Sequence, residues 1–275
     1  MKFFIHRLET CASSNDAARD LAEAGAPEGT VVVAGEQTAG RGTKGRSWHS
    51  APGLGLYASF LLRPASTGIA LLPLAAGLAA RDAVESSHGL SARLRWPNDI
   101  LFDGRKLGGV LCESSITGGR PEFAILGIGL NVNHGPEDFP VDLRDTAISV
   151  GGALGRPADP GRLFDALLVA VGFRLEALAR GDTGGLIRAF NDQSIFRPGD
   201  PVWISENGPA LARDSYSRSS AAEADPQTKP GVPAAAPAAE LLFAYEGIDA
   251  DGALLARDAA GILHRFVSAE VRKAL

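Results

Sequence analysis

The sequence predicts an α+β fold in which a mixed sheet with helices is followed by a small C-terminal β-barrel. Strand and helix patterns are mixed up to about residue 195, and beyond Arg197 the apolar segments shorten to the length of barrel strands. The 275 residues and the 45% hydrophobic content suit two domains with a sizeable core. We therefore expect domains at residues 1–195 and 196–275.

The elements of the first domain follow from apolar spacing and from the residues that interrupt it. Ser13 to Asp16 begins a helix that runs through Ala24 and stops at Gly25, with Asp16 in capping-box position relative to Ser13. Pro73 suits the first turn of an apolar helix over residues 69–84. Strands are predicted at 30–34, 54–62, 92–96, 100–102 and 124–131, a further helix at 166–178 and a closing segment at 187–191.

The second domain is predicted from four short strands at residues 202–204, 241–247, 253–256 and 263–267. Residues 207–239, between the first two, are rich in Ser, Ala and Pro. Such a composition cannot bury enough apolar surface to order itself, so we expect a disordered insertion in a barrel hairpin.

Composition excludes several classes of protein. The net charge of −5 does not favour nonspecific binding to nucleic acid. No run of eighteen apolar residues occurs, and the N-terminal residues lack the apolar core of a signal peptide, so we expect a cytoplasmic protein with no membrane association. Cys11 and Cys112 have no metal or redox spacing and are expected to be buried thiols in a reducing compartment, and the five histidines are scattered singly.

The loop from Gly40 to Trp48 concentrates three cations and three glycines in nine residues of an acidic chain. Glycine lets backbone N–H groups approach a ligand closely, while Arg41, Lys44 and Arg46 supply the charge that a phosphate or carboxylate requires. A solvated basic surface loop is the alternative interpretation.

Two polar interruptions of apolar strands point to the same ligand site. Pro97, Asn98 and Asp99 break the predicted strand at 92–96 before it resumes at residue 100. Asn131 ends the glycine-containing apolar strand at 124–131. We expect these polar groups to lie on neighbouring strands and to line a binding site.

Five ordered motifs identify a family resemblance that covers nearly the whole chain. In chain order they are Ser13-Ser14-Asn15, the loop Gly40-Arg41-Gly42-Thr43-Lys44-Gly45-Arg46-Ser47-Trp48 preceded by Gln37, Trp96-Pro97-Asn98-Asp99 with Lys106 and Gly109, Gly127 to Asn131, and the C-terminal segments 247–254 and 267–272. This series resembles the biotin protein ligases, which activate biotin with ATP and attach it to a lysine of a carboxylase carrier domain.

The resemblance implies a substrate set and a residue for each contact. It implies biotin and ATP as substrates, Mg²⁺ as the accompanying ion, no tightly bound prosthetic group, and the biotin carboxyl carrier protein as partner. The implied biotin contacts are Ser13, Ser14, Asn15, Gln37, Gly40, Arg41, Gly42, Thr43, Lys106 and Gly109. The implied ATP contacts are Lys44, Arg46, Trp48, Asn98, Asp99, Asn131 and Arg272, with Asp99 also facing Mg²⁺.

Lys106 and Arg41 are the implied catalytic residues. Lys106 would stabilise charge between the biotin carboxylate and the α-phosphate while keeping its proton, and Arg41 would cover the phosphates as the loop closes. Without the resemblance, Lys106 reads as an exposed lysine in the turn over residues 103–106. At Thr43 the family loop commonly carries a second arginine, so this chain has a neutral hydroxyl in its place.

Three other functions were weighed against this one. A lipoate-type ligase shares the domain and the reaction class, but the basic glycine loop with Trp-Pro-Asn-Asp favours biotin. A biotin-sensing repressor requires a DNA-binding module, and only twelve residues precede Ser13. A non-catalytic biotin or nucleotide sensor could lose Lys106, which this chain retains. The sequence leaves dimerisation open.

Overall fold

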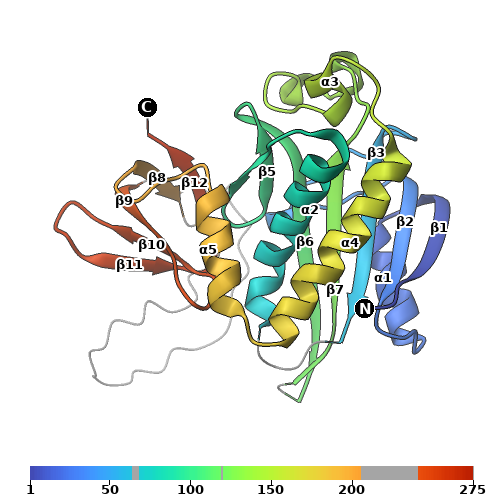
Figure 1. Ribbon diagram of the computed structural model, residues 1–275, viewed down its shortest axis with the longest axis horizontal. Coiled ribbons are helices and arrows are strands. Elements are labelled where there is room, and N and C mark those ends of the chain that lie inside the picture. Colours follow the sequence, from blue (N-terminus) through green and yellow to red (C-terminus); the bar gives the residue numbers. More distant parts are fainter. Residues whose placement is uncertain (64–67, 119, 206–240, 275) are drawn as a thin grey trace, which may run out of the picture.

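A seven-stranded mixed sheet forms the larger part of the computed structural model, which describes residues 1–63, 68–118, 120–205 and 241–274. Its strand order is β1-β2-β3-β7-β6-β5-β4, and only β1 and β2 are parallel among its pairs (Figure 1). The mixed sheet predicted from the sequence is confirmed. In chain order the strands are β1 (Phe4–Cys11), β2 (Thr30–Gln37), β3 (Gly55–Leu62), β4 (Arg93–Arg95), β5 (Asp99–Phe102), β6 (Arg105–Thr117) and β7 (Arg120–Asn131).

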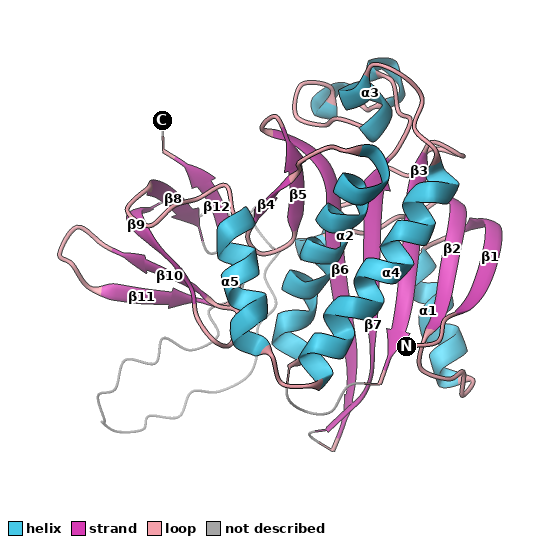
Figure 2. Cartoon of the chain, in the orientation of Figure 1, coloured by secondary structure: helices cyan, strands magenta, loops and turns pink. Residues whose placement is uncertain are grey.

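Helices cover both faces of this sheet. α2 (Leu72–His88), α4 (Pro160–Ala179) and α5 (Thr183–Gln193) lie on one side, and α1 (Ser14–Glu23) lies on the other (Figures 1 and 2). The alternation of side chains along β2 explains the division, because Val32 packs with Ala18 of α1 whereas Val31 and Val33 join the core under α2 and α4. The short helix α3 (Val150–Leu154) follows β7 after two 3₁₀ turns.

A second, antiparallel sheet contains the C-terminal strands in the order β11-β10-β9-β8-β12. It is consistent with the small barrel that the sequence predicts. The indole of Trp96 is buried and its Nε1 donates to the carbonyl of Gly252 at 2.9 Å, which attaches this sheet to the segment between β4 and β5. The strands are β8 (Pro201–Ser205), β9 (Leu241–Ile248), β10 (Leu254–Arg257), β11 (Leu263–Phe266) and β12 (Glu270–Lys273), and the insertion predicted at 207–239 lies outside the described residues.

Several local expectations need correction. Ser13 is the N-cap of α1, but its side chain makes no capping hydrogen bond, so the capping box with Asp16 does not form. The strands that carry Asp99 and Asn131 are not neighbours, because β6 lies between β5 and β7. Lys106 belongs to β6, and the turn before it consists of Asp103 and Gly104, both with positive φ.

The structure describes the surroundings of both cysteines and the length of each helix. Cys11 and Cys112 are free thiols and only partly buried, unlike the fully buried thiols expected. Burial, with the nearby Glu113 charge, raises the pKa of the Cys112 thiol to about 12, which keeps it protonated at neutral pH. Among the described residues, no helix combines the length and the apolar character needed to cross a membrane.

Candidate functional site: a cavity with a neutral and a cationic end

A cavity of about 460 Å³ opens beside the N-terminus of α1 and is lined by residues from several separate segments of the chain. Most of the residues implied by the resemblance line it. These are Ser13, Ser14, Asn15, Gln37, Arg41, Gly42, Thr43, Arg46, Trp48, Asn98, Asp99, Lys106, Gly109 and Asn131, whereas Gly40, Lys44 and Arg272 are not among its lining residues.

Glycines of β6 and β7 form part of the cavity wall because they let other side chains lie directly on the sheet. A Cβ at Gly127 would stand 2.3 Å from Oδ1 of Asn15, and one at Gly129 would stand 2.8 Å from the indole of Trp48. Gly109 pairs with Gly129 across the two strands. The close approach that the sequence predicts for these glycines is therefore present.

A chain of neutral polar groups lies at one end of the cavity, which we call the neutral end: Ser14, Asn15 and Gln37 line it, and Ser59 is buried behind them. Oγ of Ser59 lies 2.6 Å from Oδ1 of Asn15 and 2.8 Å from Oγ of Ser14. Oε1 of Gln37 accepts from the backbone N–H of Ser14 and lies 3.0 Å from its hydroxyl. At the far side, Nε2 of Gln37 donates to Ser50 at 2.8 Å.

The neutral end has more acceptors than protons. Three contacts join Oδ1 of Asn15, the hydroxyls of Ser59 and Ser14, and Oε1 of Gln37, yet the two hydroxyls carry only one proton each. One of the three contacts therefore lacks a hydrogen bond at any moment. A ligand that donates an N–H to this chain would supply the missing proton and be favoured there over a ligand without donors.

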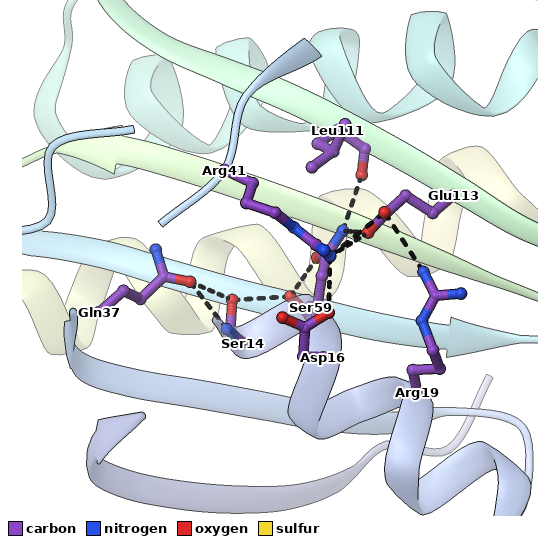
Figure 3. A network of polar contacts seen from close by, with 9 residues as sticks. Ser14, Asp16, Arg19, Gln37, Arg41, Ser59, Leu111 and Glu113 are labelled. Atoms are coloured by element: carbon purple, nitrogen blue, oxygen red, sulfur yellow. Dashed lines mark hydrogen bonds and ion pairs between the residues drawn. The ribbon is translucent and has the colours of Figure 1, made fainter. Parts of the chain in front are cut away.

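A charged cluster flanks the neutral end on its outer side. Nη2 of Arg41 lies 2.7 Å from Asp16 and 2.9 Å from Glu113, and Glu113 also contacts Arg19 at 3.2 Å (Figure 3). The two guanidinium charges balance the two carboxylates. Arg41, predicted to cover ligand phosphates, is thus held here by protein carboxylates through a single nitrogen.

The opposite part of the cavity, which we call the cationic end, is built by Lys106, Arg95 and Asp99. Nζ of Lys106 lies 2.6 Å from Oδ1 of Asp99, and Nη2 of Arg95 lies 2.6 Å from Oδ2. Burial alone would raise the pKa of Asp99, but the charges and hydrogen bonds of Lys106 and Arg95 outweigh it and lower that pKa. Two cations share one carboxylate, so this end carries a net positive charge.

Backbone hydrogen bonds also hold Lys106 in place. Its N–H donates to the carbonyl of Thr146 at 2.7 Å, and its carbonyl accepts from Ile148 and from Nδ2 of Asn131. Nδ2 of Asn131 also donates to the carbonyl of Ile148. Asn131, expected to contact ATP or its ion, therefore has its amide nitrogen committed to holding the strands that present Lys106.

Trp48 lies between the two ends. Nζ of Lys106 stands 5.4 Å from the centre of the indole, within the range of a cation–π contact. Nε1 of Trp48 is buried and has no hydrogen-bond partner among the described residues. A buried donor without an acceptor is costly, which is consistent with a ligand oxygen completing it.

Asn98 and the loop residue Thr43 meet beside the cationic end. Nδ2 of Asn98 donates to the carbonyl of Val110 at 2.9 Å and reaches Oγ1 of Thr43 at 3.4 Å. The loop is also held from the C-terminal sheet, since Arg46 pairs with Glu270 of β12 at 3.0 Å. Asn98 is therefore a support for the loop in this structure.

Gly40 and Lys44 support the loop rather than line the cavity. A Cβ at Gly40 would stand 2.5 Å from the carbonyl of Trp48, so only glycine closes the base of the loop. Lys44 adopts a positive φ of 59°, and partial burial lowers the pKa of its ammonium group. Arg272 lies on β12 opposite Trp203 of β8.

The residues at the cationic end do not form a magnesium site by themselves. Both oxygens of Asp99 contact cations, and the expected contact of this carboxylate with Mg²⁺ stays a prediction. No group of three potential metal-ligating side chains occurs among the described residues.

Sequence reasoning missed three residues of this site: Ser59, Arg95 and Glu113. Ser59 stands alone in an apolar strand, so its partners on α1 could not be inferred. Glu113 lies two and four residues after Leu111 and Gly109, on the same face of β6. A strand prediction over residues 105–117 would therefore have placed Glu113 next to the cavity.

Comparison with known proteins places this cavity within a family. A family model described as the biotin/lipoate A/B protein ligase family matches residues 9–131. The chain is 40% identical over 166 residues to the bifunctional ligase/repressor BirA of Bacillus subtilis. This match covers 58% of the present chain and about half (50%) of the length of that relative. It is 33% identical over 235 residues to the biotin–[acetyl-CoA-carboxylase] ligase of Paracoccus denitrificans, covering 84% of this chain and 85% of that protein.

Solved structures agree on the fold. The biotin protein ligase of Aquifex aeolicus in complex with biotin and ATP superposes with a TM-score of 0.74 at 24% identity, covering 98% of this chain and 99% of that one. At this level of sequence identity, the likeness shows the fold alone. Together with the extended match to the Paracoccus ligase, these findings show that the chain belongs to the biotin/lipoate A/B protein ligase family.

Proposed function

We propose that this protein is a biotin protein ligase that activates biotin with ATP to biotinyl-5′-AMP and transfers biotin to a lysine of a carrier domain. The observation that carries the proposal is the pairing of a neutral, proton-deficient end with a cationic end in one cavity of about 460 Å³. Biotin has the matching polarity, with a ureido ring at one end and a carboxylate at the other.

The neutral end suits the ureido ring. Its two N–H groups can donate to Oδ1 of Asn15 and the serine oxygens, and its carbonyl can accept from a hydroxyl. This supports biotin over lipoate, because the dithiolane head of lipoate has no N–H group to donate. The lipoate-type alternative would leave the surplus acceptors of Ser14, Ser59 and Gln37 unmatched.

The cationic end suits adenylation. A carboxylate oxygen of biotin attacks the α-phosphorus of ATP while the bond to the pyrophosphate breaks, so negative charge gathers where the two anions meet. Lys106 keeps its proton and stabilises that charge, and Asp99 and the backbone contacts at Thr146 and Ile148 hold it in place beforehand. Magnesium, bound to the phosphates, would supply further positive charge.

The second half-reaction needs a neutral lysine amine at the carbonyl of the mixed anhydride, and AMP leaves. We propose the biotin carboxyl carrier domain as its donor and a cytoplasmic location for the reaction. The names of the relatives support this partner: the Paracoccus protein is called a biotin–[acetyl-CoA-carboxylase] ligase. A non-catalytic sensor would have no need for the fixed Lys106 at the cationic end.

One experiment tests the proposal. The protein is incubated with biotin, MgATP and a biotin carrier domain, and the carrier is examined by mass spectrometry for the biotinyl increment on one lysine. Parallel reactions with lipoate, and with biotin but no ATP, serve as controls. Modification in the lipoate reaction alone would replace the proposed substrate, and no modification in any of them would remove the proposed function.

A further inference from the structure

Glu113 lies behind the cavity wall and contacts three side chains, those of Asn15, Arg19 and Arg41. Its Oε2 accepts from Nδ2 of Asn15 at 2.7 Å and from Nη2 of Arg41 at 2.9 Å, and its Oε1 contacts Arg41 and Arg19 at 3.2 Å. It is 25% exposed, against 43% for Asp16, the other carboxylate on Arg41. Figure 3 shows Arg19 of α1 and Arg41 of the loop pointing toward Glu113.

The first consequence concerns the amide of Asn15. A carboxylate only accepts hydrogen bonds, so Glu113 forces the NH₂ group of Asn15 toward itself and toward the carbonyl of Leu111. The amide oxygen of Asn15 must then face Ser59. The surplus of acceptors at the neutral end therefore originates in the charge of Glu113.

The second consequence concerns the loop. Arg41 begins the loop and is bridged to Ser47 at its other end, with Gly42 donating to the carbonyl of Arg46. The contacts found for Arg41 among the described residues all use Nη2. Nε and Nη1 are thus left to reach a ligand while Glu113 holds the other side of the guanidinium.

We propose that Glu113 is a positioning residue that sets ligand specificity at the neutral end by orienting Asn15 and that anchors the glycine-rich loop through Arg41. The inference deepens the proposed function and rests on it. Glu113 touches no reacting atom, so its loss weakens the binding of the neutral head group and leaves the adenylation chemistry at Lys106 in place.

The test compares Glu113→Gln with the wild type by pyrophosphate release. An amide at position 113 can present either its oxygen or its nitrogen to Asn15, so both orientations of Asn15 become available. A hydrogen bond to a charged group contributes about 1.5–3 kcal/mol, so we expect the KM for biotin to rise by about tenfold or more. The amide oxygen of the variant can still accept from Arg41, and Asp16 still contacts Arg41, so the KM for MgATP and the kcat should stay within about threefold of the wild type.

A biotin analogue with one ureido nitrogen methylated separates positioning from general disruption. We expect wild type to discriminate strongly against it and Glu113→Gln to discriminate less, because the variant no longer fixes the acceptor of Asn15. Asp16→Asn, which removes only the other contact to Arg41, should keep the discrimination. Glu246→Gln, which breaks an ion pair with Arg257 in the C-terminal sheet, is the matched control and should behave as wild type.

The outcomes are distinguishable. A wild-type chain that releases no pyrophosphate with biotin and MgATP removes the proposed function. If the wild type is active but Glu113→Gln has an unchanged biotin KM and unchanged discrimination, only the inference about Glu113 is overturned. The same holds if Glu113→Gln lowers kcat and raises the KM values for biotin and MgATP to the same extent. If Glu113→Gln does not fold, Glu113→Asp, which keeps the charge but shortens the reach, must show the same selective rise in the biotin KM.

Discussion

The two ends of the cavity are built on different physical terms. The neutral end is a chain of uncharged groups from α1, β2 and β3. The cationic end holds two cations on one largely buried carboxylate. Hydrogen-bond geometry provides selectivity at the first, since an unmatched polar group is costly. Under the proposed function, preorganised charge would provide catalysis at the second.

The largest effect is expected from a substitution that breaks the cationic end. Lys106→Ala should lower adenylate formation by about a hundredfold or more, comparable to the loss of one preorganised donor in a transition state. Pyrophosphate release under saturating biotin and MgATP measures it. Lys273→Ala, which breaks an ion pair with Asp200 on the C-terminal sheet, should remain near wild type. Normal release by the Lys106 variant would exclude this lysine from the mechanism.

The next largest effect is expected on the rate at which the adenylate dissociates from the cationic end. Thr43→Arg adds a charged donor to the loop where only a 3.4 Å contact to Asn98 now stands. A charge-assisted hydrogen bond contributes about 1.5–3 kcal/mol, so dissociation of the adenylate should slow by about tenfold to a hundredfold. Release can be followed after rapid dilution into unlabelled ligand. Equal rates would mean that Lys44 or Arg46 already closes the loop.

A smaller effect should separate the neutral end from the rest. The methyl group of Gly127→Ala meets Asn15 Oδ1 at 2.3 Å and should displace it. We expect the KM for biotin to rise about tenfold and that for MgATP to change little. Gly77→Ala in α2, where the nearest atom is 3.6 Å away, is the matched control. Equal rises in both KM values would contradict the division into two ends.

The smallest effect lies outside both ends, at His134. Its ring stacks on Phe139 with centroids 4.9 Å apart, and His49 and Asp138 are the titratable groups that face it. Burial, with the His49 ring beside it, lowers the pKa of His134 to about 4.

The His134 ring is protonated near pH 6.5 in the unfolded chain but only near pH 4 in the folded chain. Its contribution to stability is therefore fully present above pH 6.5 and is lost as the pH falls below that value. The free energy of unfolding, measured with urea, should fall by about 1 kcal/mol between pH 7.5 and 5.5 because of this group. His134→Leu should flatten that difference.

The sequence was most informative where chemistry is local. The glycine-rich loop, the interrupted strand at Asn98 and Asp99, and the strand ending at Asn131 were recognisable, because polar residues in apolar runs are unusual. The strand β1 was not predicted, since nearly all of its residues are exposed and show no alternation. Arg95 lies in the predicted strand at 92–96, but its bond to Asp99 depends on a turn geometry that residue type does not encode.

Long-range partners explain most of what the sequence could not provide. Asn15 and Glu113 are 98 residues apart, and Ser59 meets Asn15 across 44 residues. Such contacts depend on strand order, and the interpretation of β5 and β7 as neighbours overlooked β6. Because β6 carries both Lys106 and Glu113, that one missed strand accounts for the cluster around Arg41 that went unanticipated.

The buried indole of Trp96 has a mechanical consequence. It lies three residues before Asp99 and is tied to Gly252, while Arg46 of the loop is tied to Glu270. The C-terminal sheet thus contacts two segments that border the cavity: the one that carries Asp99 and the glycine-rich loop. A rotation of that sheet would therefore displace the segment that carries Asp99 and the glycine-rich loop together.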